Sequence, residues 1–153
     1  MPRAFDFMLP PIRPATLADL PQLELLERAS FPDFWTRESL QTALSESGYL
    51  VLVAGEVGFL IGWNVGEEAE IARLGVLAEA RGQGIGATLV ERSLADFKVR
   101  GVTSVFLEVR ADNPIAIRLY LRAGFQDIAR RKDYYRDGMD AHVMRLDLST
   151  PNP

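Results

Sequence analysis

The sequence contains no cysteine and only one histidine, His142. The missing cysteines exclude disulfides, thiolate nucleophiles and cysteine-based zinc sites, and a single histidine cannot build a multi-histidine metal cluster. A Ser-His-Asp triad would have to use His142, which lies in the alternating, strand-like run DAHVMRLDL, and the Gly-x-Ser-x-Gly nucleophile motif is absent. We therefore predict no metal site and interpret His142 as a structural residue.

An excess of basic charge and long apolar runs are also missing. Lysine and arginine number 17 against 21 acidic residues, a net charge of −4, which does not favour binding to nucleic acid. No stretch approaches the ~18 apolar residues that span a bilayer, and residues 1–11 lack the apolar core of a signal peptide. The sequence thus predicts a cytoplasmic protein without nucleic-acid or membrane partners.

What is present predicts a single domain over residues 1–153, because a chain of this length buries its apolar residues around one core. Apolar periodicity and turn residues predict the order β-α-α-β-β-β-α-β-α-β-β, a mixed α/β fold. Thr36 and Asn113 are predicted helix N-caps, with Pro114 at a first helical position and Gly124 just after a helix end. The predicted elements are a strand within 11–16, helices over 16–30 and 36–47, three strands within 49–66 and 68–77, a helix ending before 101, a strand over 104–112, a helix over 113–124, and strands over 125–135 and 139–148.

The segment ARGQGIGATLVERSL, residues 80–94, places Gly82, Gly84 and Gly86 between an apolar strand and a helix. Such a loop forms an anion site, because unpaired backbone N–H groups and the helix dipole favour negative charge. A nucleotide-hydrolysing P-loop is excluded because no Gly-Lys-Ser/Thr follows. The dinucleotide pattern G-x-G-x-x-G/A also fits, with Glu108 as its ribose-binding acid, but about 80 residues of antiparallel-type strands precede it and too few residues follow for a doubly wound fold. A phosphate-bearing ligand is the leading prediction.

Residues 81–86, RGQGIG, fit the pattern R/Q-x-x-G-x-G/A, and with this motif the chain resembles the GNAT superfamily of acetyl-CoA-dependent N-acetyltransferases. Two further segments, LEVRADNPIAIRLYLRAGF and RRKDYYRDGMDAHVMRL, are similar to the next strand and helix and to the closing hairpin of its ribosomal-protein-alanine N-acetyltransferases, the RimI type. The resemblance covers nearly the whole chain. It implies the GNAT fold, a central, mostly antiparallel, twisted sheet of about six or seven strands, splayed in the middle and flanked by about four helices.

The resemblance implies that acetyl-CoA is the co-substrate and that the backbone of the glycine loop binds its pyrophosphate. It also implies that the strand before the loop carries a bulge, and that the backbone of this strand pairs with the pantetheine arm and polarises the thioester carbonyl. The residues implied in binding acetyl-CoA are Leu74, Gly75, Val76, Gly82, Gln83, Gly84, Ile85, Gly86, Ala87 and Asn113.

The resemblance further implies that Glu108 is the catalytic base, directly or through water, and that Tyr120 donates a proton to the departing thiolate. A carboxylate such as Glu108 is uncommon in an apolar strand unless its face borders a cleft or solvent, whereas Tyr120 alone would also fit a core aromatic. Trp35, Tyr134 and Tyr135 match substrate-binding positions of the family. Its FPW segment is stretched here to FPDFW, and the two tyrosines would also fit cross-strand pairs of a hairpin.

Acid-base arithmetic favours an α-amine as the acceptor. Freeing an α-amine of pKa ~8 at pH 7 costs about 1 kcal/mol, whereas freeing a lysine side chain of pKa ~10.4 costs about 5 kcal/mol. The resemblance implies a protein N-terminus, such as that of a ribosomal protein beginning with alanine, attacking acetyl-CoA directly in a ternary complex. The sequence leaves open a small-molecule amine or a lysine side chain as acceptor, a coenzyme A-binding module without catalysis, and the dinucleotide binder.

Overall fold

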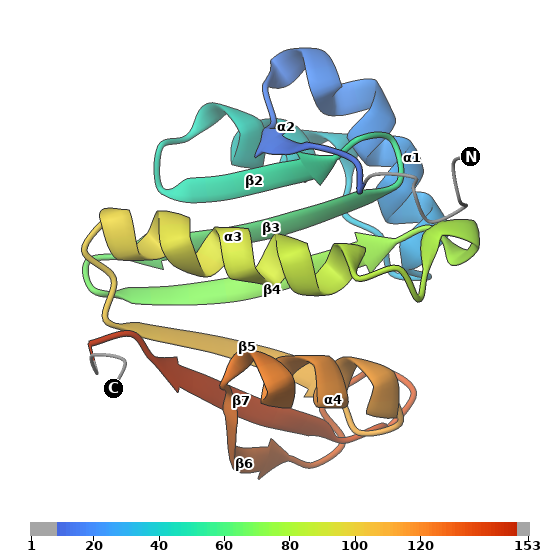
Figure 1. The fold of residues 1–153 in the computed structure, drawn as a ribbon. Coiled ribbons are helices and arrows are strands. Elements are labelled where there is room, and N and C mark those ends of the chain that lie inside the picture. Colours follow the sequence, from blue (N-terminus) through green and yellow to red (C-terminus); the bar gives the residue numbers. More distant parts are fainter. Residues whose placement is uncertain (1–8, 150–153) are drawn as a thin grey trace, which may run out of the picture.

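One sheet of seven strands runs through residues 9–149, which are the residues that the computed structural model describes (Figure 1). The spatial order is β1-β2-β3-β4-β5-β7-β6, and every neighbouring pair is antiparallel except β4 and β5, which are parallel. The observed element order confirms the mixed α/β fold predicted from the sequence. The strands are β1 (Ile12–Pro14), β2 (Tyr49–Ala54), β3 (Gly58–Val65), β4 (Glu68–Val76), β5 (Ser104–Arg110), β6 (Gln126–Arg131) and β7 (Ala141–Asp147).

Four α-helices of the described chain cover the two faces of this sheet (Figure 1). The first two pack on one face and the last two on the other. Over the same residues, none of the helices has the length and apolar composition needed to cross a membrane. The helices are α1 (Leu20–Ser30), α2 (Arg37–Ser45), α3 (Ile85–Val99) and α4 (Pro114–Ala123), with short 3-10 turns η2 (Leu17–Asp19) and η3 (Ala78–Ala80).

Two helices begin at the predicted capping residues. The Thr36 hydroxyl accepts a hydrogen bond from the Ser39 amide at 3.1 Å, and Asn113 Oδ1 accepts one from the Ala116 amide at 3.1 Å. Pro114 follows Asn113 at the first position of α4, where its missing N–H costs nothing. Each cap satisfies a backbone donor that the helix cannot, and is worth about 1 kcal/mol.

The first helix begins later than predicted. Residues 17–19 form a 3-10 turn, and the Leu17 carbonyl accepts its hydrogen bond from the Leu20 amide. Pro21 has no amide hydrogen to offer that carbonyl, so the α-helical bond from residue 21 to residue 17 cannot form, and α1 begins at Leu20.

Strand alternation divides the apolar side chains between two cores. On β2, Leu50 and Leu52 face α3, whereas Val51 and Val53 face α1 and α2. All four are at most 6% exposed, and burial of each contributes about 1.5–3 kcal/mol. Because both faces are packed in this way, the helices and their first residues are held at fixed positions on the sheet.

The sheet opens between β4 and β5. Ala72 is an extra residue in β4, lying between Ile71 and Arg73, which pair with consecutive residues of β3. The parallel pairing of β4 with β5 ends at Ile71 opposite Leu107. Beyond this point the two strands diverge, and α3 and α4 both begin at the open end (Figure 1). The splayed sheet is therefore confirmed.

The last two strands are joined differently from the prediction. A loop over 132–140 connects them, so the strand predicted over 125–135 is wrong at its C-terminal end. Within the loop, the Tyr135 amide donates to the Met139 carbonyl at 3.1 Å and the Gly138 amide donates to the Tyr135 carbonyl at 2.9 Å. These local bonds close a turn that replaces the cross-strand ladder.

β6 forms one edge of the sheet, and each of its residues is exposed. It pairs only with β7, and the register of that pair shifts between Asp127 and Ala129. Its exposed side chains include the apolar Ile128 next to the charged Asp127, Arg130 and Arg131.

Candidate active site

The glycine loop connects the end of β4 to the start of α3. Gly82 and Gly84 have φ angles of +80° and +87°, and a Cβ at either position would meet no atom within 4 Å. Glycine is needed at both for the left-handed backbone conformation, and the loop surface there faces open space. Gly86 has a different role, because a Cβ there would lie 3.1 Å from Leu119 Cδ1 on α4. Gly86 therefore lets α3 and α4 pack closely.

The start of α3 presents unused backbone donors next to this loop. The Thr88 amide donates to the Gly84 carbonyl at 3.0 Å, so the N–H groups of residues 84–87 have no acceptor within the helix. Together with the helix dipole they form a surface that favours an anion. Arg81 Nε donates to the Val76 carbonyl at 2.9 Å and so holds the loop against the end of β4.

The end of β4 lies beside this loop, at the opening of the sheet. Leu74 and Val76 pack against the core under α3. Gly75 faces α1 instead, where a Cβ would come within 2.6 Å of both Ser30 Oγ and Phe59 Cε1. Glycine at this position therefore allows α1 to approach the strand. On the side facing β5, the backbone of these three residues has no strand partner.

Glu108 lies on β5, on the opposite face of the sheet from α3 and α4. Its neighbours Leu107 and Val109 point into the core, so strand alternation turns Glu108 toward the face that carries α1. The Tyr134 hydroxyl donates to Glu108 Oε1 at 2.8 Å, and Arg131 Nε pairs with Oε2 at 2.7 Å. The bond to this carboxylate raises the pKa of Tyr134. The structure thus brings together Glu108 and Tyr134, which the sequence singled out separately.

Tyr135 lies beside Tyr134, with the two rings edge to face and their centroids 5.0 Å apart. Burial, followed by the charge of Glu108, raises the pKa of Tyr135 to about 12. The Arg110 guanidinium lies 4.9 Å from the Tyr135 ring and pairs with Asp137 in the same loop at 2.6 Å. The loop that carries both tyrosines is therefore attached to the end of β5. The two rings are loop residues, so their alternative assignment as cross-strand hairpin pairs is wrong.

Tyr120 is on the inner face of α4 and is only 7% exposed. Its ring packs edge to face on Phe125, with centroids 5.7 Å apart. Burial, and to a smaller extent its electrostatic interaction with Tyr135, raises the pKa of Tyr120. The phenol therefore keeps its proton well above neutral pH, which is the state that a proton donor requires.

Residues 16–125 match the model of the acetyltransferase (GNAT) family. The chain belongs to this family. It is an acetyl-CoA-dependent N-acetyltransferase, and the resemblance seen in its sequence is confirmed.

Relatives of this GNAT acetyltransferase include proteins with named acceptors. The ribosomal protein bS18-alanine N-acetyltransferase of Escherichia coli is 33% identical over 138 residues, which cover 86% of this chain and 93% of that protein. The crystal structure of the Escherichia coli ribosomal-protein-S18-alanine N-acetyltransferase has a TM-score of 0.83 at 30% identity and covers 93% of this chain and 96% of its own. Arabidopsis thaliana NAA60, solved in complex with acetyl-CoA, shares the fold, with a TM-score of 0.84 at 22% identity over 92% of this chain and 99% of its own.

The residues at the opening of the GNAT sheet fit acetyl-CoA. Open space over Gly82 and Gly84 leaves room for phosphate groups next to the free N–H groups of α3. The unpaired edge of β4 offers backbone donors and acceptors to an extended, amide-containing chain such as pantetheine. Asn113 stands at the start of α4, with its side chain bonded to the Ala116 amide.

Trp35 is placed differently from the other residues expected to contact the acceptor. Its ring stacks on Trp63 with centroids 6.3 Å apart, and Tyr49 packs against Trp63 in turn. The aromatic group lines a hollow of about 340 Å³ on the α2 side of the sheet together with Ser39 and Thr42. Trp35 thus anchors the segment between α1 and α2 through its ring.

A buried ion pair attaches that same segment to β4. Arg73 Nη2 lies 2.7 Å from Glu27 Oε1, and the side chains are 12% and 0% exposed, respectively. Glu27 Oε1 also accepts a hydrogen bond from the Trp35 amide at 2.9 Å. The Arg73 guanidinium lies 3.8 Å from the Phe31 ring centroid. Because Arg73 directly follows the bulge, the pair fixes the FPDFW segment to the strand at the opening.

Sequence reasoning did not single out Glu70, Arg131, Glu27 or Arg73. Glu70 alternates with apolar residues and so fits any strand with one solvated face, and Arg131 lies in a basic run typical of a surface. Glu70 and Arg131 come close to Glu108 only because β4, β5 and β6, which are distant in the chain, meet in space. A contact between strands that are distant in the chain produces no spacing pattern in the sequence.

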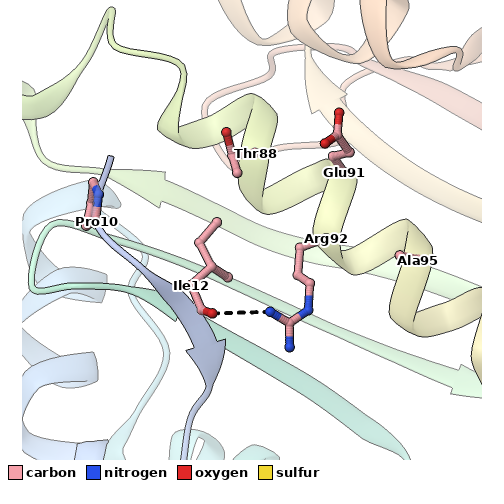
Figure 2. Close-up of a pocket in the computed structure, with 6 residues that line it drawn as sticks. All are labelled: Pro10, Ile12, Thr88, Glu91, Arg92 and Ala95. Atoms are coloured by element: carbon pink, nitrogen blue, oxygen red, sulfur yellow. Dashed lines mark hydrogen bonds between the residues drawn. The ribbon is translucent and has the colours of Figure 1, made fainter. Parts of the chain in front are cut away.

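Another hollow lies between β1 and α3 (Figure 2). It measures about 440 Å³, and Arg92 crosses it to donate to the Ile12 carbonyl at 3.2 Å. None of the predicted site residues lines it. The opening between β4 and β5 is therefore a separate region of the molecule.

We expect the Gly84→Val variant to lose stabilisation by acetyl-CoA. For the native protein, a ligand concentration of 100 times Kd should raise Tm by about 5–10 °C. In the variant, the valine side chain would fill the open space over the loop, and the shift measured by differential scanning fluorimetry should disappear.

Gly101→Val is the matched control for this experiment. Gly101 has the same φ of +87° and equally open surroundings, but it follows the other end of α3. Both variants carry a backbone strain of roughly 1–2 kcal/mol, so both should melt earlier than the native protein. A normal acetyl-CoA shift in Gly84→Val would contradict the assignment of the loop.

Proposed function

We propose that this enzyme transfers the acetyl group of acetyl-CoA to the α-amino group of a protein N-terminus, by direct attack within a ternary complex. The observation that carries the proposal is the opening between β4 and β5. The anion-binding start of α3 lies on one face of the opening, and the carboxylate of Glu108 lies on the other. A donor and an acceptor entering from opposite faces would meet at the edge of β4.

Each group at the opening then has a chemical role. Acetyl-CoA supplies the acetyl group in activated form, as a thioester. Glu108 accepts the proton of the incoming ammonium group, and Tyr120 gives its proton to the departing thiolate. The free edge of β4 from Leu74 to Val76 holds the pantetheine arm, and Gly82–Ala87 with Asn113 bind the rest of coenzyme A.

Two facts support an α-amine as the acceptor. The α-amine needs only about 1 kcal/mol to lose its proton at pH 7, which one carboxylate can provide without special tuning. The Escherichia coli relative, which matches over most of its length, is named as an alanine N-acetyltransferase of ribosomal protein bS18. We therefore propose an N-terminal alanine as the first acceptor to test, with Tyr134 and Tyr135 contacting the peptide.

A pair of peptides tests this proposal. A peptide with a free N-terminal alanine should be acetylated at its α-amine, as located by mass spectrometry. The same peptide, blocked at its N-terminus and carrying one lysine, should react at least about 100-fold more slowly, because its amine must lose a proton at a much higher pKa. Preferential labelling of lysine, or turnover only with a small amine, would overturn the proposed acceptor.

A further inference from the structure

Glu70 lies at the apex of the opening, on the same face as Glu108. It pairs with Phe106 in the short parallel ladder, one position before that ladder ends. Ala69 and Ile71 point into the core under α3, so Glu70 points to the opposite face. The side chain is half-buried and interacts electrostatically with Glu108.

The negative charge of Glu70 is not matched by a cationic partner of its own. Within residues 9–149 its carboxylate accepts no hydrogen bond and forms no ion pair. Arg131 is the cation whose charge acts on Glu70, and it is already paired with Glu108, whose other oxygen accepts a hydrogen bond from the Tyr134 hydroxyl.

Other arginines on this face have partners of their own. The Arg145 guanidinium lies over the Phe106 ring, 5.9 Å from its centroid, and donates to Ser104 at 3.0 Å, while Arg73 is paired with Glu27. Neither arginine forms an ion pair with Glu70, so the charge of Arg131 is shared between the carboxylates of Glu108 and Glu70.

A half-buried carboxylate without a partner is unfavourable unless it takes up a proton or a cation. Burial and the charge of Glu108 raise the pKa of Glu70, and Arg131 only partly opposes this. A protonated α-amine supplies both missing components, a positive charge and a proton to give away. The unpaired carboxylate of Glu70 thus has the chemistry of an ammonium site.

We propose that Glu70 and Glu108 act as a pair that binds the acceptor's ammonium group and takes up its proton. This inference rests on the proposed function and divides the role of proton acceptor between two residues. One proton passes from nitrogen to the pair, whose charge changes from −2 to −1. The neutral nitrogen keeps its lone pair, which forms the new bond to the acetyl carbon as the bond to sulfur breaks.

The test compares Glu70→Gln, Glu108→Gln and the double variant on the alanine peptide between pH 6 and 9. We expect Glu70→Gln to lower kcat/KM at pH 7 by about 10–100-fold and to recover toward the native value at pH 9, where the amine loses its proton unaided. The double variant should be little slower than Glu108→Gln alone, because the two carboxylates handle one proton. Glu70→Asp, which keeps the charge, should retain a native-like pH profile.

Glu68→Gln is the matched control, since Glu68 is an exposed residue two positions earlier on the same face of β4. A Glu70→Gln variant as active as this control would overturn the pair, and so would a defect of equal size at every pH or full additivity in the double variant. A native enzyme that acetylates no free N-terminus would overturn the proposed function instead. Thermal melting of each variant separates loss of folding from loss of chemistry.

Discussion

In the Glu108→Gln variant, kcat/KM for acetylation of an α-amine near pH 7 is expected to fall by about 10²–10⁴. Glutamine keeps the shape of the side chain and can still accept a hydrogen bond from the Tyr134 hydroxyl, but it is not basic. Part of the loss should return as the pH rises toward 9, because the amine then deprotonates without help. Initial rates with the alanine peptide across pH 6 to 9 measure both effects.

Tyr120→Phe provides the contrast. Because burial raises the pKa of Tyr120, the native phenol stays protonated throughout this pH range. Its loss removes a proton donor, so the defect should persist at pH 9. Neither variant should change the affinity for acetyl-CoA, because the glycine loop is untouched. If Glu108→Gln were as active as the native enzyme at every pH, Glu108 would be only a carboxylate at the edge of the opening.

A Glu27→Gln substitution should lower the free energy of unfolding by about 3–5 kcal/mol, the cost of leaving a buried charge without its partner. Glutamine is nearly isosteric and can still accept the Trp35 amide, so the loss comes mainly from the uncompensated Arg73 guanidinium. This is a large part of the 5–15 kcal/mol that usually stabilises a protein. Urea unfolding followed by circular dichroism measures the change.

The control for Glu27→Gln lies one turn away on the same helix. Glu24 pairs with Arg37 at 3.0 Å, but the Arg37 side chain is 59% exposed. Glu24→Gln should therefore cost no more than about 1 kcal/mol. Equal losses in the two variants would mean that Arg73 finds another partner, such as Asp33 at 4.0 Å, and that the Glu27 pair does not hold the segment to β4.

Local sequence signals predicted most of the fold. Thr36 and Asn113 cap their helices as expected, since a cap depends only on residues three positions apart. The prediction was wrong where a boundary depended on more than local pattern. The alternating run after Phe125 looks like a strand as far as Tyr135, but β6 stops at Arg131 because the following residues bond to one another and to β5.

The candidate site was predictable only in part. The glycine loop is contiguous, so its motif could be recognised, and Glu108 was singled out as a charge within an apolar strand. Glu70 and Arg131 join Glu108 only because strands β4, β5 and β6 meet in space. Trp35 was expected to contact the acceptor, and its stacking on Trp63 of β3 could not be foreseen from the FPDFW segment.

The exposed edge strand β6 also bears on how the enzyme avoids aggregation in a crowded cell. An edge strand offers unpaired backbone groups to which another chain can add, and Ile128 would make such an addition more favourable. Asp127 before it, Arg130 and Arg131 after it, and the register shift at Asp127–Ala129 all oppose the regular, uncharged ladder that a growing fibril needs. The same arginine that pairs with Glu108 at the opening therefore also places a charge on the exposed edge of the sheet, where it opposes the addition of another strand.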